Sequence, residues 1–376
     1  MNKVPEKKIR VLVADDSAFM CKVLKEIINS DAQLEVAGTA RDGREAVALA
    51  ESLRPDVITM DINMPHLDGL QATELIMSQH PRPVVIVSSE SREGAASTLR
   101  ALELGAIDFV PKPTNGIDLD MRNIREELTR KLKMAAKVRV VRTATMSKLA
   151  TPHAPVSVAS ALAHNAERAA QNNISNGTKF PIVVIAASTG GPAAVMRVVA
   201  GLPKDLQAAV LLVLHMPAAF TTQYALQLAE FTGIRVKEAE ANETVQPGTL
   251  YICPGGQHLR VSPTGRIELD AVTGRIDGYL PNIDVTMESV AAYAGAMSIA
   301  VVLTGMGSDG ARGTRTIKTA GGLVIAQDEA SSVIFGMPAE AIKAGVVDRV
   351  LGIDDIYAAI EKRVLALCRP LPVGAR

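Results

Sequence analysis

Ser188 stands in a turn where its hydroxyl could act as a nucleophile. The turn, residues 188–191, follows the apolar run Ile182–Ala187, whose β-branched residues are typical of a strand buried on both faces. Pro192 suits the first position of a helix, and Gly201 suits the residue just past its end. A strand, a tight turn and a helix N-terminus together place one hydroxyl beside free backbone N–H groups, which is the layout of a nucleophile elbow.

The same turn also fits two roles without covalent chemistry. A Gly-rich turn lets a strand and a helix pack closely, and a helix N-terminus can hold a phosphate. The turn matches neither G-x-G-x-x-G nor G-x-x-x-x-G-K-[ST], so it gives little support for a nucleotide site. It is also an incomplete G-x-S-x-G, because Ala186 occupies the place of the first glycine. A nucleophilic Ser188 therefore needs a base and an acid from elsewhere in the chain.

Two histidines could supply the base. His215 directly follows an apolar run, so it would lie at the same edge of a parallel sheet as Ser188. A histidine in that place can equally be a hydrogen-bonded structural residue. His258 follows a Pro-Gly-Gly turn in a hairpin-like segment, and we expect it at the rim of the site.

Three carboxylates could orient the base. Asp309 lies in the Gly-rich loop after the run Ala300–Thr304, and such a loop could wrap closely around a reaction site. Asp284 and Asp328 compete with it, and spacing favours Asp309 without excluding them. The chain order would then be Ser…His…Asp, unlike the Ser…Asp…His order of α/β-hydrolases, but geometry and not order defines a triad.

A second group of polar residues lies in the N-terminal third of the chain, each at the end of a strand-like run or just after it. Three of them are carboxylates, which would repel one another unless a cation lies between them, and hard oxygen ligands suit Mg²⁺. A nearby hydroxyl and ammonium are what a phosphoryl group on one carboxylate would need for its oxygens. Each residue alone could be a polar strand end in a solvated loop. Five at one edge favour a site: Asp15, Asp16, Asp61, Ser88 and Lys112.

The strand-like runs that would position this group alternate with amphipathic segments such as Ala18–Ile28 and Arg44–Leu53. Regular βα alternation predicts a flavodoxin-like, doubly wound parallel sheet of five strands, with ligands at the carboxyl ends of the strands. We expect the strands at Ile9–Ala14, Leu34–Ala40, Val57–Met60, Val84–Ser88 and Asp108–Val110.

A stretch without periodicity separates the two halves of the chain. An apolar stripe predicts a last helix of the first half over Gly116–Lys137, after which Ala, Ser, Thr, Asn, Pro and His dominate. A weak helix over Val158–Ala170 fits this composition, and His153 and His164 are expected to be bystanders. We therefore expect a first domain over residues 1–136, a flexible linker over 137–179 and a second domain over 180–376.

The second domain again alternates apolar strands and helices, interrupted by a more polar, hairpin-like patch at His258–Leu269. It has no helix-turn-helix signature and no basic recognition helix, which argues against transcriptional control. The pattern predicts a larger α/β domain with a mostly parallel sheet and some antiparallel strands. The expected strands are Ile182–Ala187, Ala208–Leu214, Ile234–Glu238, Thr249–Cys253, Ala300–Thr304 and Leu323–Gln327.

The composition bounds the function. The 376 residues suffice for about two domains, and 48% are apolar, so large cores are available. Forty basic residues balance forty acidic ones, so we expect no nucleic-acid partner. Three distant cysteines indicate neither a disulfide framework nor a zinc site. Without a signal peptide or an apolar stretch of the ~20 residues that span a bilayer, we expect a cytoplasmic protein that is not embedded in a membrane.

The first domain resembles the response-regulator receiver family over about residues 8–136. The resemblance rests on Asp15-Asp16-Ser17, the segment Asp61–Gly69, Ser88-Ser89 and Lys112-Pro113. It implies that Asp61 accepts a phosphoryl group from a partner histidine kinase and that Ser88 and Lys112 sense its arrival. It also implies Mg²⁺ as the cofactor of this phosphorylation, held by Asp16, Asp61 and the carbonyl of Asn63, with Asp15 nearby.

The second domain resembles the catalytic domain of CheB chemotaxis methylesterases through AASTGGP, LVLHMPAAFT, VKEAE, GTLYICPGGQHL, LTGMGSDGARG and IAQDEASSVIFGMPAEAI. The family implies hydrolysis of γ-glutamyl methyl esters on the cytoplasmic helices of chemoreceptors, with release of methanol, and deamidation of selected receptor glutamines. No cofactor is implied for hydrolysis. By motif, Ser188 is the nucleophile, His215 the general acid/base and Asp309 the residue that holds the imidazole, while Thr189 and Met306 are candidate oxyanion donors.

Two positions depart from the family pattern. Ala186 replaces the glycine that is usual two residues before the nucleophile, a small change to the elbow. The segment Gly278–Asp284 stands where many members carry a basic H-x-R-P-S-V-D segment, which bears on the preference for a particular receptor.

Three functions are compatible with these residues. In the main hypothesis, the unphosphorylated receiver covers the Ser188 site of a methylesterase/deamidase, and phosphorylation of Asp61 shifts the equilibrium toward an open enzyme. A second is a non-enzymatic adaptor that competes for phosphoryl groups and binds receptors. An intact set of Ser188, His215 and Asp309 argues against the adaptor, because a binding module needs no such set. A third, with less support, is a nucleotide-binding oxidoreductase.

Overall fold

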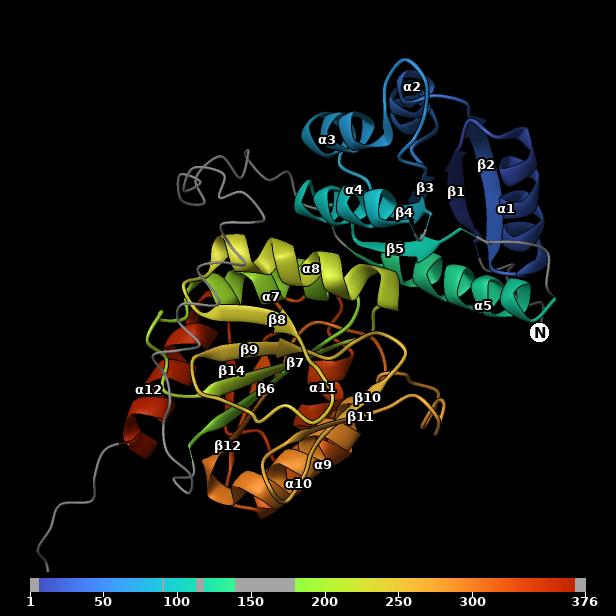
Figure 1. Ribbon diagram of the computed structural model, residues 1–376. Helices are drawn as coiled ribbons and strands as arrows, with labels where there is room; N and C mark the ends of the chain where they lie inside the picture. Colours follow the sequence, from blue (N-terminus) through green and yellow to red (C-terminus); the bar gives the residue numbers. More distant parts are fainter. Residues whose placement is uncertain (1–6, 90, 113–117, 139–179, 369–376) are drawn as a thin grey trace, which may run out of the picture. The chain divides into compact units, whose positions relative to one another are not determined.

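The computed structural model describes residues 7–89, 91–112, 118–138 and 180–368 (Figure 1). The chain divides into two compact units, residues 1–150 and 151–376. The weak helix expected over 158–170, together with His153 and His164, lies outside the described residues. Among the helices within those ranges, none is both long enough and apolar enough to cross a membrane.

A five-stranded parallel sheet forms the first unit, in the order β2-β1-β3-β4-β5. This order confirms the predicted doubly wound sheet, whose switch point lies at β1 and β3. The strands are β1 (Ile9–Ala14), β2 (Leu34–Ala40), β3 (Val57–Met60), β4 (Val84–Ser88) and β5 (Asp108–Pro111). The helices are α1 (Ala18–Ser30), α2 (Gly43–Leu53), α3 (Gly69–Gln79), α4 (Arg92–Glu103) and α5 (Asp118–Ala135).

A seven-stranded sheet forms the second unit, in the order β14-β13-β12-β6-β7-β9-β8, and every neighbouring pair is parallel. The strands are β6 (Ile182–Ala187), β7 (Ala209–Leu214), β8 (Arg235–Glu238), β9 (Thr249–Ile252), β12 (Ser298–Val302), β13 (Leu323–Gln327) and β14 (Arg349–Leu351). The helices are α7 (Gly191–Ala200), α8 (Ala218–Phe231), α9 (Ile283–Ala294), α10 (Ala311–Thr319), α11 (Met337–Lys343) and α12 (Ile356–Cys368). This confirms the predicted larger α/β domain.

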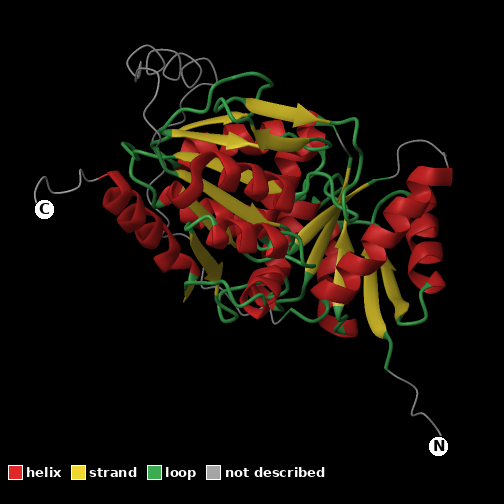
Figure 2. Ribbon diagram, turned by 90° about the horizontal axis from the view of Figure 1, so that it is seen from below, coloured by secondary structure: helices red, strands yellow, loops and turns green. Residues whose placement is uncertain are grey.

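Both faces of the larger sheet are buried. Every residue of β6 and β7 is inaccessible to solvent, which explains why these strands are unbroken apolar runs. Alternate side chains of β6, those of Ile182, Val184 and Ala186, join one core with residues of α9, α10 and α11. Figure 1 shows α7 and α8 on one side of this sheet and α9 and α10 on the other, and in Figure 2 the strands lie among the red helices.

Three details differ from the sequence prediction. The antiparallel strands, β10 (His258–Val261) and β11 (Ile267–Asp270), form a two-stranded sheet of their own instead of joining the large one. β12 lies at Ser298–Val302 and not at Ala300–Thr304, because its ladder with β6 ends at Val302. The edge strand β14 was not predicted, since it is only three residues long and carries two exposed residues. The other strand boundaries agree with the structure within one residue.

The fully buried Thr304 fastens three segments that follow strands of the larger sheet. Its hydroxyl donates to the carbonyl of Thr189 at 3.0 Å and accepts from the N–H of Ile334 at 2.9 Å. Its own N–H donates to Gln327 Oε1 at 2.8 Å, and its carbonyl accepts from the N–H of Ser188 at 3.1 Å. The turn that carries Ser188 is therefore tied to the ends of β12 and β13.

Thr304→Val would remove this hydroxyl while keeping the side-chain volume. The buried N–H of Ile334 would lose its partner, so we expect the free energy of unfolding to fall by ~1–3 kcal/mol, measured by calorimetry on the full chain. Thr316→Val is the matched control, because the Thr316 hydroxyl donates to the Arg312 carbonyl at an exposed place on α10. Equal losses in the two variants would contradict the role given to Thr304.

Candidate functional site

Ser188 directly follows β6, between the ends of β12 and β7. The N–H of Gly191 donates to the Ser188 carbonyl at 2.7 Å, which closes the tight turn before α7. Gly305 faces this turn so closely that a Cβ there would lie 2.9 Å from Ser188 Cβ and would also strike the sulfur of Met337. The half-buried serine side chain is thus held at the carboxyl edge of the sheet by close backbone packing.

His215 is the neighbour of Ser188 on the adjacent strand. The last paired residues of β6 and β7 are Ala187 and Leu214, so Ser188 and His215 both come one residue later. The His215 Nε2 atom lies 2.8 Å from Asp309 Oδ2, and the imidazole is 15% exposed. With Nε2 committed to Asp309, Nδ1 is the ring nitrogen that can take a proton from a hydroxyl.

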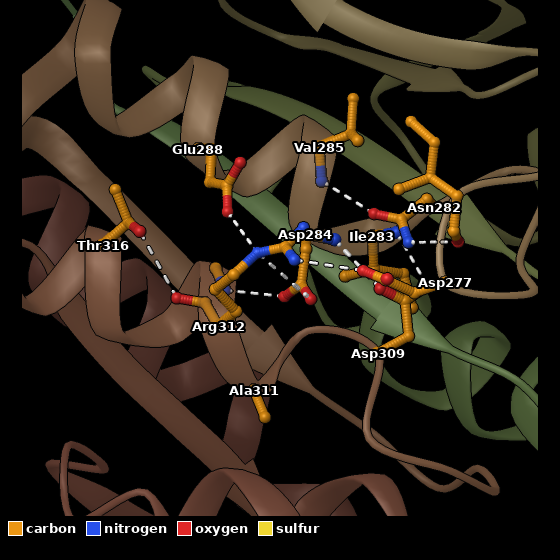
Figure 3. Close-up of polar contacts among 12 residues, drawn as sticks. Asp277, Asn282, Ile283, Asp284, Val285, Glu288, Asp309, Ala311, Arg312 and Thr316 are labelled. Carbon is orange, nitrogen blue, oxygen red and sulfur yellow. Dashed lines mark hydrogen bonds and ion pairs between the residues drawn. The ribbon is translucent and has the colours of Figure 1, made fainter. Parts of the chain in front are cut away.

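Asp309 is held by the first turn of α9 (Figure 3). Its Oδ2 atom accepts from the N–H of Ile283 at 2.8 Å, and its Oδ1 atom accepts from the N–H of Asp284 at 3.0 Å. The positive end of the α9 dipole faces the same carboxylate, which stabilises negative charge there. The side chain is fully buried, so these donors replace water.

The two histidines have separate tasks. His258 was expected at the rim, but it is completely buried. Its Nε2 contacts the Gly274 carbonyl at 2.7 Å, and its Nδ1 lies 3.1 Å from the N–H of Asn282. These partners require the neutral tautomer with the proton on Nε2. Both ring nitrogens of His258 are therefore used in holding the chain, whereas Nδ1 of His215 has no such role among the contacts given above, so His215 remains our candidate base.

The competing carboxylates also face other partners. Asp328 accepts from the N–H of Ser331 at 2.9 Å and from its hydroxyl at 2.6 Å, so it caps a turn. Asp284 accepts from the N–H of Gly313 at 2.6 Å, in the first turn of α10. Asp309 thus accepts from the first turn of α9, in which Asp284 lies, and Asp284 accepts from the first turn of α10, which follows Asp309 (Figure 3). Of the three carboxylates, Asp309 is the one for which a contact with His215 is seen.

The two candidate oxyanion donors lie in segments that flank Ser188. Thr189 is buried in the turn itself, and Met306 is half-buried next to Gly305 in the loop that leads to Asp309. The N–H of Gly305 donates to the Ile334 carbonyl at 3.0 Å, which fixes the start of this loop. Their backbone N–H groups remain our candidates for stabilising an oxyanion.

An acidic cluster lies at the carboxyl edge of the smaller sheet. Asp15, Asp16 and Asp61 each offer an oxygen, and these atoms lie within 4.8 Å of one another. Lys112 Nζ lies 3.0 Å from Asp15 Oδ2 and 2.8 Å from Asp61 Oδ2.

Burial raises the pKa of Asp61, although the hydrogen bond and charge of Lys112 oppose the rise. Burial also disfavours the charged form of Lys112, but Asp61 and Asp15 together raise the pKa of its ammonium.

The other predicted receiver residues lie at the same edge. The buried Ser88 ends β4, and its carbonyl accepts from the N–H of Lys112 at 2.7 Å. Its hydroxyl donates to the Gly94 carbonyl at 3.3 Å. Asn63 is exposed in the loop after β3. The three converging carboxylates match the hard oxygen ligands that Mg²⁺ prefers, and the carbonyl of Asn63 remains our candidate for a further ligand.

Comparison with known proteins finds one family in each half of the chain. The CheB methylesterase family matches residues 183–360, and the response regulator receiver domain matches residues 11–123. A protein-glutamate methylesterase/protein-glutamine glutaminase of Symbiobacterium thermophilum is 44% identical over 96% of this chain and 98% of that protein. Its namesake in Pyrococcus horikoshii is 42% identical over 95% of this chain and 94% of that protein. The chain belongs to the CheB family.

A solved structure is also similar. The CheB methylesterase catalytic domain of Thermotoga maritima is 39% identical, covers 49% of this chain and 99% of that chain, and gives a TM-score of 0.48. As a CheB family member, the chain is a protein-glutamate methylesterase/protein-glutamine glutaminase with a receiver domain. It is therefore a hydrolase of the chemotaxis system, and neither the adaptor nor the oxidoreductase hypothesis is needed.

Asp284 gives a pH-dependent prediction. Burial raises its pKa, and the neighbouring Asp309 adds to the rise, while the Gly313 N–H opposes it. The folded protein thus binds a proton at Asp284 more readily than the unfolded chain. The charged carboxylate costs stability at neutral pH, and that cost disappears as the pH falls through the raised pKa.

We therefore expect Asp284→Asn to be at least as stable as wild type at pH 7, because the amide oxygen still accepts from Gly313 and Arg312 keeps Glu288 and Asp277 as partners. As the pH is lowered toward 4, the free energy of unfolding of wild type should rise relative to that of this variant. Asp284→Ala should lose ~1–3 kcal/mol at pH 7, because the Gly313 N–H loses its acceptor. Urea unfolding at each pH measures these free energies. If the difference in stability between wild type and Asp284→Asn does not change with pH, the raised pKa of Asp284 is refuted.

Proposed function

We propose that Ser188, His215 and Asp309 form the catalytic triad of an esterase that demethylates glutamate residues on the cytoplasmic helices of chemoreceptors. The observation that carries the proposal is the 2.8 Å contact between His215 Nε2 and Asp309 Oδ2, beside a serine that follows the adjacent strand. The family's demethylating activity supplies the ester, and the triad supplies a nucleophile, a base and an orienting acid. This chemistry belongs to the proposed domain over residues 180–376.

In the first half of the reaction, Ser188 Oγ adds to the ester carbonyl carbon while His215 takes the hydroxyl proton. The carbonyl electrons move to oxygen, and the backbone N–H groups of Thr189 and Met306 donate to that oxyanion. When the tetrahedral intermediate collapses, the methoxy group takes the proton from His215 and leaves as methanol.

In the second half, water attacks the acyl-enzyme and His215 takes its proton. The second tetrahedral intermediate expels Ser188 Oγ, which takes the proton back from His215. The glutamic acid product then loses its own proton to water and is released as the carboxylate. Deamidation of a receptor glutamine follows the same steps, with ammonia leaving in place of methanol. Asp309 keeps the imidazole oriented through both halves and stabilises its charged form.

We also propose that Asp61 accepts a phosphoryl group from a chemotaxis histidine kinase and that this raises the rate of hydrolysis. Lys112, which bridges Asp15 and Asp61, can pair with the added oxygens, and Ser88 can donate its hydroxyl to them. Mg²⁺, when bound, would offset the charge of the phosphoryl oxygens. The residues that would hold it are Asp15, Asp16, Asp61 and the carbonyl of Asn63. The receiver would span residues 1–136 and the linker 137–179.

The triad predicts a difference between two carboxylates that both follow strands. Ser188→Ala and Asp309→Asn should each lower methanol release from methylated receptor by roughly 10⁴-fold or more, because nucleophile or imidazole orientation is lost. Asp328→Asn is the control and should stay close to wild type, since this side chain caps the turn at Ser331. Receptor binding by Ser188→Ala should be intact. Comparable methanol release from Ser188→Ala would overturn the assignment.

Phosphorylation can be tested on the same substrate. Asp61→Asn should take up no label from radioactive acetyl phosphate, and its methanol release should not rise when acetyl phosphate and Mg²⁺ are added. Glu74→Gln makes the same change of charge at an exposed residue of α3 and should behave as wild type. Label on a residue other than Asp61 would refute the acceptor, and a wild-type rate unchanged by phosphorylation would refute the activation.

A further inference from the structure

Tyr279 lies on the face of the histidine that we assign as the general base. The phenol ring stacks on the imidazole of His215, with ring centroids 4.6 Å apart and an interplanar angle of 17°. The stack leaves Nε2 directed at Asp309. One face of the imidazole is therefore covered by an aromatic ring and not by water.

The segment that carries Tyr279 is held in place by buried polar groups. His258 contacts the Gly274 carbonyl at one end and accepts the Asn282 N–H at the other. Between them, Ile276 and Tyr279 exchange backbone hydrogen bonds of 3.0 Å in both directions. The Asn282 side-chain amide adds a bond of 3.0 Å to the Ile276 carbonyl. Tyr279 is thus presented by a loop whose ends and turn are fixed before substrate arrives.

The far end of the tyrosine ring reaches the loop that follows β12. A Cβ at Gly307 would overlap the Tyr279 hydroxyl, and Gly307 has a φ of +97°, so both space and backbone conformation favour glycine there. Met306, our candidate oxyanion donor, is the preceding residue. Tyr279 therefore contacts the proposed base at one point and the neighbour of the proposed oxyanion donor at another.

We propose that Tyr279 is a positioning residue of the hydrolysis, which holds the plane of the His215 ring and stabilises the imidazolium that forms when Ser188 gives up its proton. The face of an aromatic ring is electron-rich and attracts a cation stacked on it, and this attraction is absent while the imidazole is neutral. The stabilisation therefore grows toward the transition state and acts on kcat. This inference rests on the proposed triad.

Removing the aromatic face should slow the reaction without weakening substrate binding. Tyr279→Leu should lower kcat for methanol release from methylated receptor by about 2- to 30-fold, with KM unchanged within about twofold. Tyr279→Phe keeps the ring and should retain at least about half of the wild-type kcat. The assay uses the full chain with saturating acetyl phosphate and Mg²⁺.

Tyr357→Leu is the matched control. It is the same substitution at a half-buried tyrosine, whose ring packs on Gly201 at the far end of α7 from Ser188. It should leave kcat unchanged. Ser188→Ala, measured in parallel, separates the two proposals: if it keeps wild-type activity, the triad itself is wrong.

If Ser188→Ala is inactive and Tyr279→Leu keeps the wild-type kcat, or raises KM alone, the role of Tyr279 is wrong. An equal loss in Tyr279→Phe and Tyr279→Leu would also overturn it, because the hydroxyl would then matter and not the ring face. Should Tyr279→Leu fail to fold, phenylalanines with increasing numbers of ring fluorines at position 279 keep the shape while removing the negative face. The value of kcat should fall with each added fluorine, and a flat series would refute the proposal.

Discussion

The buried carboxylate of Asp309 joins the start of a helix to the end of a strand, and the geometry of the proposed catalytic triad depends on it. Its oxygens accept the N–H groups of Ile283 and Asp284 and contact the ring nitrogen of His215. Because two of these donors belong to the backbone of α9, the carboxylate cannot turn without losing them. The side chain of Asn282 fixes where α9 begins by accepting the Val285 N–H. The direction of the imidazole is therefore set by the place where a helix starts.

Both units put their polar groups at the carboxyl edge of a parallel sheet for the same physical reason. The central strands are covered on both faces, so a polar side chain within them needs a partner in the protein, as the Thr59 hydroxyl finds in the Leu12 carbonyl. Just after a strand the chain leaves the ladder, and polar side chains from neighbouring strand ends can meet one another. Asp15 and Asp61 follow β1 and β3, and Ser188 and His215 follow β6 and β7. Neighbouring parallel strands then bring these residues together, although they are far apart in the chain.

The burial of these strands also explains what could be predicted from the sequence. The fully buried strands β6 and β7 are unbroken apolar runs, so their ends, and the polar residues after them, could be located closely. The burial of His258 could not be predicted, because it depends on Gly274 and Asn282, which the hairpin and the start of α9 bring close to the imidazole. Asp309 could not be separated from Asp284 by spacing, since both are buried and the packing of α9 on α10 decides which way each carboxylate points. The contact of Tyr279 with His215 likewise arises only in the fold.

The two acidic centres differ in the donors that face them, and the difference fits the role that we propose for each. Asp309 is met by backbone N–H groups, which are neutral and fixed, so its direction would stay constant while His215 gained and lost a proton in the proposed mechanism. Asp61 is met by the N–H of Ile62 and by the ammonium of Lys112, which also contacts Asp15. A charge on a flexible stem can follow oxygens that are added to the carboxylate, whereas a helix N-terminus cannot. The fixed donors therefore suit an orienting residue, and the movable cation suits an acceptor whose charge changes.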